Sequence, residues 1–574
     1  MKNQEIAKIF YEIAEYLKMD EVAFRPYAYQ KAALNLENLE QDVEEIYKKQ
    51  GLKGLEKISG VGKHIALKIE EYLKKGKIKY YEKLKKKSPV NLGELTAVEG
   101  LGPKKIKTLY QKLGIRNVKD LEKAAKSHKI EQLFGFGEKT EKNILESIEF
   151  LKKDKGRFLL GEILPVVEEV YGELKNLKQV ERIDVVGSLR RMKETIGDID
   201  FLIASKNPQK VMDFFVSLRG IEKVWGKGIT KASVRMRQGF DIDVRVVSKK
   251  NYGAALQYFT GSKEHNIAVR KIAISKRFKL NEYGLFKGKK MIAGRTEKEV
   301  YKALGMDWMP PEIRENQGEV EAALKGKLPN LIAFKDIKGD LHCHSDWDGG
   351  ENSISEMAQK AMEMGYEYIG ISDHTKFLII ERGLNEKELS EQRKEIDKLN
   401  EKFKKKNLKF RILHGAETNI LKDGSIDIKD QALKKLDYVI AGIHSNFKMS
   451  KIEMTKRMIK AMKNPNIDII SHPTGRILKR REEYEIDFDK ILRTAKEFKV
   501  ILEINSSPYR LDLNDRNIRR CKDAGVKMVV STDAHHKDQM KYIELGIAQA
   551  RRGWAEKKDI ANAYPLNKLL KDFK

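Results

Sequence analysis

The chain has 574 residues, 41% of them hydrophobic, which is enough apolar material for several packed cores and excludes an intrinsically disordered chain. It contains no run of about 18 apolar residues, so a membrane-spanning helix is excluded as well. The length predicts about three to five domains, and 114 Lys and Arg against 85 Asp and Glu give a net charge of +29, which favours a polyanionic partner.

Charge and histidine content both change at about residue 330. Residues 1–330 have 66 basic and 46 acidic side chains, a net charge of +20, whereas the rest of the chain has 48 and 39, a net charge of +9. Three of the eleven histidines lie in the first part and eight in the second. This distribution predicts a nucleic-acid-binding part followed by a part that uses histidine. A lysine-rich surface that serves solubility at high temperature is the alternative explanation of the charge.

The cysteines and the first residues bear on the cellular compartment. Cys343 and Cys521 are too few to crosslink a secreted chain of this size. The opening residues MKNQEIAKIF lack the apolar core of a signal peptide. We therefore expect a cytoplasmic protein.

Residues 1–150 predict short helices, because apolar residues recur at spacings of three and four and glycines interrupt them. Three interruptions, at 58–65, 98–106 and 133–140, share a Gly-x-Gly turn and a lysine at a helix start, and they resemble the helix-hairpin-helix motif. Such a turn lets the backbone approach a phosphate, at which the N–H groups of the next helix point. One copy alone is equally an ordinary helical turn, but three copies beside lysines favour DNA binding. The expected contacts are Gly60, Gly62, Lys63, Gly100, Gly102, Lys104, Gly135, Gly137 and Lys139.

Residues 151–316 change character, because β-branched runs now alternate with helical stretches. Strands are predicted at 182–186, 198–203 and 240–247. Residues 317–336, which contain two glycines and a proline, are expected to form a linker.

From residue 337 onward, strand-like runs alternate with helices. Strands are predicted at 368–372, 438–441 and 528–531. This alternation favours a parallel β/α architecture, which we expect to close into a barrel.

The central region contains closely spaced aspartates. Asp198 and Asp200 are two apart on a predicted strand, so their side chains share one face. The segment Asp241-Ile-Asp243 on a later strand can supply a third carboxylate. Three carboxylates suit two Mg²⁺ ions, of which one activates a 3′-hydroxyl and the other neutralises a triphosphate.

A Gly-Ser pair precedes these aspartates. Gly187 follows a predicted strand and admits phosphates, which the Ser188 hydroxyl and Arg191 would hold. An Asp-x-Asp pair alone usually lies on a solvated strand face. Together with Gly-Ser at this spacing, it predicts nucleotidyl transfer.

Residues 1 to about 316 resemble the family X DNA polymerases, the nucleotidyltransferase group that includes DNA polymerase beta. Tyr258-Phe-Thr-Gly-Ser262 resembles the block of that family beside the incoming sugar, whereas Lys263-Glu264-His265 departs from its usual acidic and aromatic residues. The resemblance implies that Tyr258 and Phe259 exclude a ribonucleotide 2′-hydroxyl. It implies the metal ligands Asp198, Asp200 and Asp243, and DNA contacts at Arg245 and Arg270. The implied dNTP-binding residues are Gly187, Ser188, Arg191, Tyr258, Phe259, Gly261, Ser262 and Asn266.

Lys68 follows the first hairpin by one helical turn. It resembles the Schiff-base lysine with which some relatives remove a 5′-deoxyribose phosphate. A simple phosphate contact is the alternative.

Histidines and carboxylates follow several predicted strands of the C-terminal region. His342 and His344 lie two apart at one strand end, and further candidates follow five apolar strands. The carboxyl ends of barrel strands surround one mouth, so these residues would converge there. Clustered imidazoles with carboxylates favour Zn²⁺, Mn²⁺ or Fe over Mg²⁺, although a lone histidine at a strand end is usually structural.

The histidine pattern resembles the polymerase and histidinol phosphatase (PHP) domain, a trinuclear-metal phosphoesterase barrel that bacterial and archaeal family X polymerases carry C-terminally. The family commonly has Ser-Asp-Gly after its first histidines, whereas Asp348 here precedes Gly349-Gly350 and is shifted by one position. His414, His536 and Cys343 are close by but outside the pattern. The implied ligands are His342, His344, Asp348, His374, Glu417, His444, His472, Asp533 and His535.

The predicted fold is multi-domain, with helical helix-hairpin-helix domains, an α+β nucleotidyltransferase palm and a C-terminal β/α (PHP) barrel. The expected domains are a lyase-like DNA-binding domain (1–85), a fingers-like domain (86–150), the palm (151–255), a thumb-like nucleotide-selection domain (256–316), the linker (317–336) and the PHP domain (337–574).

The predicted function is filling of short DNA gaps with dNTPs, with 3′-end processing by the PHP domain, most readily as a Mn²⁺-dependent 3′–5′ exonuclease and alternatively as a phosphatase or AP endonuclease. Expected cofactors are two Mg²⁺ in the palm and up to three Mn²⁺ or Zn²⁺ in the PHP domain. Expected partners are gapped or nicked double-stranded DNA, with no membrane and a monomeric chain. Two alternatives remain: a non-polymerase nucleotidyltransferase fused to a small-molecule phosphatase, and a non-catalytic DNA-end scaffold.

Overall fold

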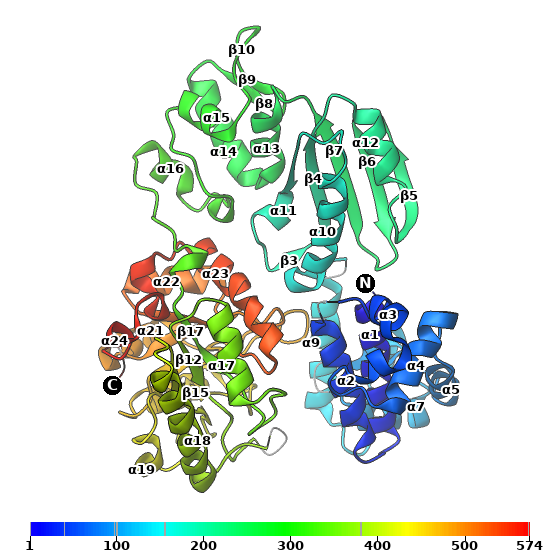
Figure 1. The fold of residues 1–574 in the computed structure, drawn as a ribbon, viewed down its shortest axis with the longest axis vertical. Helices are drawn as coiled ribbons and strands as arrows, with labels where there is room; N and C mark the ends of the chain where they lie inside the picture. Colours follow the sequence, from blue (N-terminus) through cyan, green and yellow to red (C-terminus); the bar gives the residue numbers. More distant parts are fainter. Residues whose placement is uncertain are drawn as a thin grey trace. The chain divides into compact units, whose positions relative to one another are not determined.

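The fold is that of a computed structural model, which describes residues 2–39, 41–96, 98, 101–153, 156–378, 382–571 and 573 (Figure 1). The chain forms two units, one made of residues 1–155 with 479–482 and the other of residues 156–478 with 483–574. Among the described residues, no helix combines the length and the apolar content that a bilayer crossing requires.

The first unit is helical, as the spacing of its apolar residues predicts. Ile6, Phe10 and Ile13 lie on one face of the first helix and are fully buried in a core to which the other helices contribute. The helices are α1 (Lys2–Met19), α2 (Arg25–Asn38), α3 (Val43–Glu56), α4 (Lys63–Lys75), α5 (Lys79–Lys87), α6 (Leu92–Thr96), α7 (Pro103–Leu113), α8 (Val118–Lys126) and α9 (Glu138–Lys153).

The second unit begins with the predicted palm, a mixed sheet of strand order β2-β4-β7-β6-β5. In β7, Ile242, Val244 and Val246 are buried while the alternate residues are half-buried, so one face packs and the other carries polar groups. Strands β4 and β7 are parallel neighbours. The elements are β1 (Phe158–Leu159), α10 (Leu160–Lys175), β2 (Arg182–Val186), α11 (Gly187–Arg190), β3 (Thr195–Ile196), β4 (Asp198–Ala204), α12 (Pro208–Phe215), β5 (Ile221–Lys227), β6 (Lys231–Met236) and β7 (Asp241–Val247).

The predicted thumb combines helices with a small antiparallel sheet of order β10-β9-β8. Its elements are α13 (Tyr252–Thr260), α14 (Lys263–Ser275), β8 (Lys279–Asn281), β9 (Gly284–Lys287), β10 (Lys290–Ala293) and α15 (Glu297–Ala303). The stretch 317–336, expected as a linker, contains the helix α16 (Glu319–Leu324). Val320 and Ala323 of this helix are buried in the thumb core.

The C-terminal domain alternates parallel strands with helices, as predicted. Its strands form two sheets, β11-β12-β13 and β14-β15-β16-β17-β18. Isolated bridges pair His374 with Glu417 and Cys343 with Ala534, which links the two sheets. Closure into one barrel stays a prediction. The strands are β11 (Gly339–Cys343), β12 (Tyr368–Ile371), β13 (Arg411–His414), β14 (Glu417–Asn419), β15 (Ile440–Gly442), β16 (Ile469–Ile470), β17 (Ile501–Asn505) and β18 (Met528–Ser531).

Helices α17 to α22 lie between successive strands of this domain, and α23 and α24 follow the last strand. They are α17 (Ile354–Glu363), α18 (Glu386–Lys405), α19 (Asp430–Leu433), α20 (Lys451–Met462), α21 (Phe488–Phe498), α22 (Asp515–Ala524), α23 (Ile543–Arg552) and α24 (Leu566–Leu569).

Candidate active sites

The predicted palm carboxylates converge on neighbouring strands. Asp200 on β4 stands in register with Asp243 on β7, and Asp198 lies two residues before Asp200 on the same strand. Burial, followed by the charges of Asp198 and Asp243, raises the pKa of Asp200 to about 7. Bound cations relieve this kind of repulsion between carboxylates. The arrangement is therefore suited to divalent metal ions.

A fourth aspartate of the palm has a different role. Asp241 accepts hydrogen bonds from Arg235 Nε at 2.5 Å and from Trp225 Nε1 at 2.8 Å, and the bond from Arg235 holds its pKa below the usual value. Asp243 instead faces Lys231, whose Nζ lies 3.2 Å from its Oδ2. Asp243 also accepts a hydrogen bond from the Ser233 hydroxyl. Of the two, Asp243 is the one in register with Asp200, which makes it the candidate third metal ligand.

Position 187, the first of the Gly-Ser pair, requires glycine because a carboxylate lies close to it. Gly187 has φ +66°, and a Cβ there would lie 2.8 Å from Asp200 Oδ2. Any other residue would clash with the carboxylate and adopt an unfavourable backbone conformation. Gly187 and Ser188 form the start of α11, which places both beside the palm carboxylates.

Arg191 lies between the palm and the end of α13. Its Nη1 donates to the Thr260 carbonyl, and its Nε lies 3.0 Å from Glu315 Oε1. A Cβ at Gly261 would lie 3.1 Å from Arg191 Nη1, so this glycine borders the guanidinium. Ser262 follows and caps α14, where its hydroxyl accepts from the N–H of the third helical residue. The structure thus brings these predicted dNTP-binding residues together.

The aromatic pair at the end of α13 is half-buried. The rings of Tyr258 and Phe259 meet edge to face with centroids 5.1 Å apart, and Arg245 Cζ lies 4.8 Å from the Phe259 ring centroid. Asn266 Nδ2 donates to the Tyr258 carbonyl at 2.7 Å, and Arg270 Nε donates to the Asn266 carbonyl at 3.2 Å. Asn266 therefore fixes the backbone that carries the aromatic pair.

In the helical unit, the second glycine of each hairpin directly precedes a helix. These glycines are Gly62 before α4, Gly102 before α7 and Gly137 before α9. A Cβ at any of them would meet nothing within 4 Å, so internal packing does not demand glycine there. The lysines that follow, Lys63, Lys104 and Lys139, are exposed.

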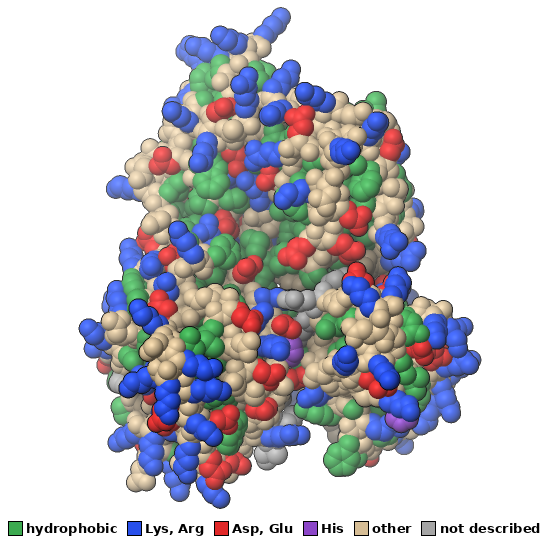
Figure 2. Space-filling view, in the orientation of Figure 1, with side chains coloured by type: hydrophobic (Ala, Val, Ile, Leu, Met, Phe, Trp, Pro, Cys, Tyr) green, Lys and Arg blue, Asp and Glu red, His purple; other side chains and the backbone are tan. Residues whose placement is uncertain are grey.

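The first glycine of a hairpin has a positive φ, as the turn requires. φ is +71° at Gly60 and +85° at Gly135, while Gly100 lies outside the described residues. Figure 2 shows Lys and Arg side chains over much of the visible surface, with fewer Asp and Glu between them. The hairpins therefore present exposed lysines at helix N-termini, with room at the glycine before each helix, as phosphate binding requires.

Lys68 on α4 is flanked by aromatic rings. Its Nζ lies 5.8 Å from the ring centroid of Tyr29 and 5.3 Å from that of Tyr80, and it donates to the His64 carbonyl at 3.1 Å. Burial lowers the pKa of Lys68. A lowered pKa increases the fraction of neutral, nucleophilic amine.

The predicted ligands of the C-terminal domain come from strand ends and from the loops after them. Glu417 lies at their centre and is fully buried. Its two oxygens lie between 2.9 and 3.8 Å from five imidazoles, those of His342, His344, His374, His444 and His472. Asp533 lies on another side, with Oδ1 3.6 Å from His342 Nε2 and 3.4 Å from His344 Nε2.

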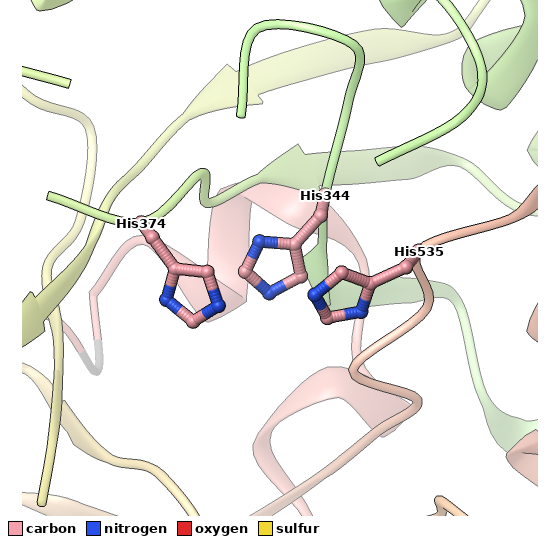
Figure 3. Close-up of side chains that lie close together, drawn as sticks. All are labelled: His344, His374 and His535. Atoms are coloured by element: carbon pink, nitrogen blue, oxygen red, sulfur yellow. The ribbon is translucent and has the colours of Figure 1, made fainter. Parts of the chain in front are cut away.

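Three of the histidines stand side by side (Figure 3). The ring centroid of His344 lies 4.4 Å from that of His374 and 4.1 Å from that of His535. One nitrogen of each of these residues lies within 4.8 Å of the others. His535, which the sequence predicts as a ligand, is therefore part of the cluster.

Asp348 lies behind His344. Its Oδ2 is 2.7 Å from His344 Nδ1 and accepts the backbone N–H of His374 at 2.8 Å. It leaves His344 Nε2 directed at Glu417 and Asp533. A carboxylate on the far nitrogen of a ligand histidine fixes its tautomer and orientation.

Glu503 on β17 supports the cluster in the same way and is a residue that the sequence analysis missed. Its Oε1 lies 2.6 Å from His342 Nδ1, and its Oε2 accepts the N–H of His472 at 2.7 Å. The available signal was an acidic residue inside the apolar run 500–504, since burying a carboxylate requires partners.

The electrostatics of the cluster is balanced between imidazoles and carboxylates. Burial alone would lower the pKa of His342, but the carboxylates of Glu503, Glu417 and Asp533 raise it well above its usual value. Burial alone would raise the pKa of Glu417, but the imidazoles of His342, His444 and His374 hold it well below. The carboxylates thus favour the protonated form of His342 and raise the pKa of His344 as well, whereas burial lowers the pKa of His444 and that of His535 to about 4.

The donor set also fits transition-metal ions. Several ligand atoms are buried without a hydrogen-bond partner among the described residues: His342 Nε2, His344 Nε2, His374 Nδ1, Glu417 Oε2, His444 Nε2 and His472 Nδ1. Buried polar atoms without partners are costly unless they coordinate an ion. The cluster is therefore a candidate metal centre for more than one ion.

Known families match along the chain. The model of a helix-hairpin-helix domain matches residues 1–78, that of a SAM-like helix-hairpin-helix tandem 92–149, that of the DNA polymerase beta thumb 255–315 and that of the PHP domain 340–507. The DNA polymerase/3′-5′ exonuclease PolX of Bacillus subtilis (strain 168) is 37% identical over 571 residues, which cover 99% of this chain and 98% of that protein.

The chain belongs to the family X DNA polymerases that carry a PHP domain. The predicted resemblance and the predicted fold class are thereby confirmed, while closure of the PHP domain into a barrel stays a prediction. Two shorter relatives share about a third of this chain. A probable phosphatase of Caldicellulosiruptor bescii is 30% identical over 231 residues, 84% of its length, and one of Thermoanaerobacter sp. (strain X514) is 34% identical over 211 residues, 78% of its length.

Proposed function

We propose that this protein is a DNA-directed DNA polymerase that fills short gaps in DNA repair, and that its PHP domain degrades DNA from the 3′ end. The observation that carries the proposal is the convergence of Asp198, Asp200 and Asp243 beside Gly187 and Arg191, in a chain that belongs to this family. The relative in B. subtilis, which is named a DNA polymerase/3′-5′ exonuclease, is matched over 98% of its length.

In the palm, Asp198, Asp200 and Asp243 would hold two Mg²⁺ ions. Bound there, the ions supply activation of the primer 3′-hydroxyl and neutralise the charge on the triphosphate. Gly187 leaves room for the phosphates, while Ser188 and Arg191 donate hydrogen bonds to them. Tyr258 and Phe259 would border the sugar.

In the PHP domain, the histidine cluster with Glu417 and Asp533 would hold up to three ions, which we assign as Mn²⁺ or Zn²⁺ from its nitrogen-rich donor set. Bound there, the ions supply an activated water for phosphoester cleavage. Asp348 and Glu503 orient His344 and His342 through their far nitrogens. The same site would also act as a phosphatase or an AP endonuclease on damaged DNA.

A second candidate activity, removal of a 5′-deoxyribose phosphate, is supported by Lys68. Its lowered pKa and its place between Tyr29 and Tyr80 favour a nucleophilic amine beside a phosphate-binding hairpin. Borohydride should trap the protein on such a DNA end. Absence of an adduct, or an adduct that persists in Lys68→Ala, would remove this activity from the proposal.

The substrates follow from the same features. Hairpins that bind phosphates without contacting bases would bind gapped or nicked double-stranded DNA of any sequence. The incoming nucleotides would be dNTPs. We assign the protein to the cytoplasm as a monomer. A nucleotidyltransferase for RNA or small molecules is disfavoured by the hairpins and the thumb match, and a non-catalytic scaffold by the retained carboxylates and histidines.

Incubation with gapped DNA tests the proposal. With dNTPs and Mg²⁺ we expect the primer to be extended to fill the gap, and without dNTPs in Mn²⁺ we expect it to shorten from its 3′ end. Adding a single complementary dNTP should give extension by one residue only. Extension of an RNA or small-molecule acceptor in place of the DNA primer would contradict the polymerase assignment.

A further inference from the structure

The last helix turn of α23 in the PHP domain lies against the palm. Arg552, which is buried, donates from Nη1 to the backbone carbonyl of Arg191 at 2.9 Å. Its Nη2 pairs with Asp515 at the start of α22. One guanidinium of the PHP domain therefore joins a PHP carboxylate to the backbone of Arg191, the palm arginine that the proposed function assigns to the triphosphate.

A second link runs through the side chain of Glu315. Its Oε1 lies 3.0 Å from Arg191 Nε, 3.2 Å from Arg552 Nη1 and 3.8 Å from Lys193 Nζ. Burial would raise the pKa of Glu315, but Arg191, Lys193 and Arg552 together hold it below the usual value. Glu315 is therefore ionised and shared among three cations, and its hold on Arg191 depends on the other two.

The charges of this network favour a polyanion. Three cations, Arg191, Lys193 and Arg552, against the two carboxylates Glu315 and Asp515 leave 3 − 2 = +1 in a half-buried region. Without Arg552 the same groups would sum to zero, and Glu315 would draw more strongly on Arg191. A guanidinium neutralised in this way attracts a triphosphate less.

We infer that Arg552 of the PHP domain, acting through Glu315 and the Arg191 carbonyl, positions Arg191 for the triphosphate of the incoming nucleotide. Arg552 is a positioning residue, because it is buried against Arg191 and Glu315 and reaches the substrate only through them. The inference rests on the proposed gap-filling function and adds that the PHP domain contributes to the nucleotide affinity of the polymerase site. Preorganising a binding arginine reduces the ordering cost that binding would otherwise include.

The neighbouring residue supplies a matched control. Arg551 lies on the same helix turn and is also paired, with Nε 2.7 Å from Glu312 Oε1 and Nη1 2.7 Å from the Ile332 carbonyl. Arg552 contacts Glu312 only at its backbone carbonyl, 3.4 Å from Nη1, so the side-chain partners of the two arginines differ. Replacing Arg551 therefore removes a comparable arginine from the same helix end while leaving the Arg191 network in place.

The experiment measures KM for the correct dNTP and kcat on DNA with a one-nucleotide gap, for the wild type and for Arg552→Gln, Arg552→Lys and Arg551→Gln. Loss of charge-assisted hydrogen bonds that orient Arg191 should raise KM about tenfold in Arg552→Gln. We expect kcat to change by less than about threefold, since Asp198, Asp200 and Asp243 stay in place. Arg552→Lys should recover part of the affinity by keeping the charge, and Arg551→Gln should stay within about twofold of the wild type.

Two further measurements separate a failure of the inference from a loss of folding. The affinity for gapped DNA and the 3′-end degradation in Mn²⁺ should be unchanged in every variant, which shows that both sites remain folded. A wild-type KM in Arg552→Gln, or an equal rise in Arg551→Gln, overturns the inference. If Arg552→Gln does not fold, a wild-type KM in Arg552→Lys overturns it. A wild type that does not extend the primer at all would instead count against the proposed function.

Discussion

The palm and the PHP domain offer metal ions different donor atoms. The palm offers three carboxylates on two parallel strands, with Asp200 and Asp243 in register. The PHP domain offers mainly imidazoles around the central carboxylate of Glu417, with Asp533 at one side. Oxygen donors select hard ions such as Mg²⁺, whereas imidazoles select transition metals. One chain can therefore keep two metal sites apart by ligand type.

The two sites also differ in charge before any ion binds. In the palm the carboxylates repel one another, and with burial this raises the pKa of Asp200 to about 7. In the PHP domain the imidazoles hold the pKa of Asp533 and Glu417 well below their usual values, in spite of burial. Metal ions would relieve repulsion in the palm and displace protons in the PHP domain.

The largest effect is expected when a palm carboxylate is removed. We expect Asp198→Ala, Asp200→Ala and Asp243→Ala each to lower primer extension by about 10² or more, because the two-metal arrangement supplies several kcal/mol of charge stabilisation. Asp241→Asn is the matched control, since Asp241 is engaged by Arg235, and it should retain extension within a few-fold. Single-turnover extension on gapped DNA measures the effect, and a near wild-type rate in Asp200→Ala would contradict the palm assignment.

A smaller effect is expected at Asp348, which distinguishes a ligand from a supporting residue. Asp348 bonds the far nitrogen of His344, so Asp348→Ala should weaken metal binding about 10- to 100-fold without lowering the number of ions bound at saturation. Metal content and metal titration by calorimetry measure this, with the exposed Asp346→Ala as control. Loss of one ion at saturating metal would instead make Asp348 a direct ligand.

The hairpins should contribute to DNA binding through the charge of their lysines alone. Replacing Lys63, Lys104 and Lys139 by alanine should weaken binding of every duplex sequence equally and reduce the slope of log K against log salt by roughly 0.9 per lost contact. Fluorescence anisotropy at several salt concentrations measures this. The exposed Lys119→Ala on α8 serves as control. Losses that depend on sequence would mean that the hairpins read bases.

The smallest effect concerns a histidine of the PHP domain outside the metal cluster. Burial, and then the charge of Arg393, lowers the pKa of His414 to about 3. The unfolded chain binds this proton near pH 6.5, so the stability from the neutral imidazole is complete above pH 6.5 and is lost as the pH falls toward 3. Between pH 8 and pH 5.5 the loss amounts to about 1.4 kcal/mol. Denaturant unfolding of the PHP domain should show this loss in the wild type but not in His414→Gln, and equal losses in both would contradict the assignment.

Sequence patterns predicted the local elements well, because short-range features determine them. The strand expected at 182–186 is β2 with the same bounds, and the three Gly-x-Gly segments precede helices α4, α7 and α9. The palm carboxylates and the strand-end histidines were likewise predicted, because alternation and strand ends place side chains by rule.

Contacts between distant segments could not be predicted in this way. Glu503 reaches His342 across 161 residues, and Arg552 reaches Arg191 across 361, so no local spacing connects them. The helix α16 lies inside the stretch expected as a linker because Val320 and Ala323 pack into the thumb core, and only tertiary packing decides that. The role of Asp348 depends on which histidine nitrogen it faces, which sequence does not specify.

The palm and PHP metal sites are expected to act independently of each other, and reciprocal variants on one substrate test this. Asp200→Ala and His344→Ala are each incubated with the same gapped DNA, with dNTPs in Mg²⁺ and without dNTPs in Mn²⁺, and primer length is followed over time. We expect Asp200→Ala to lose extension and keep 3′-end degradation, and His344→Ala to do the reverse. Loss of both activities in either variant, or degradation that persists in His344→Ala, would contradict the account.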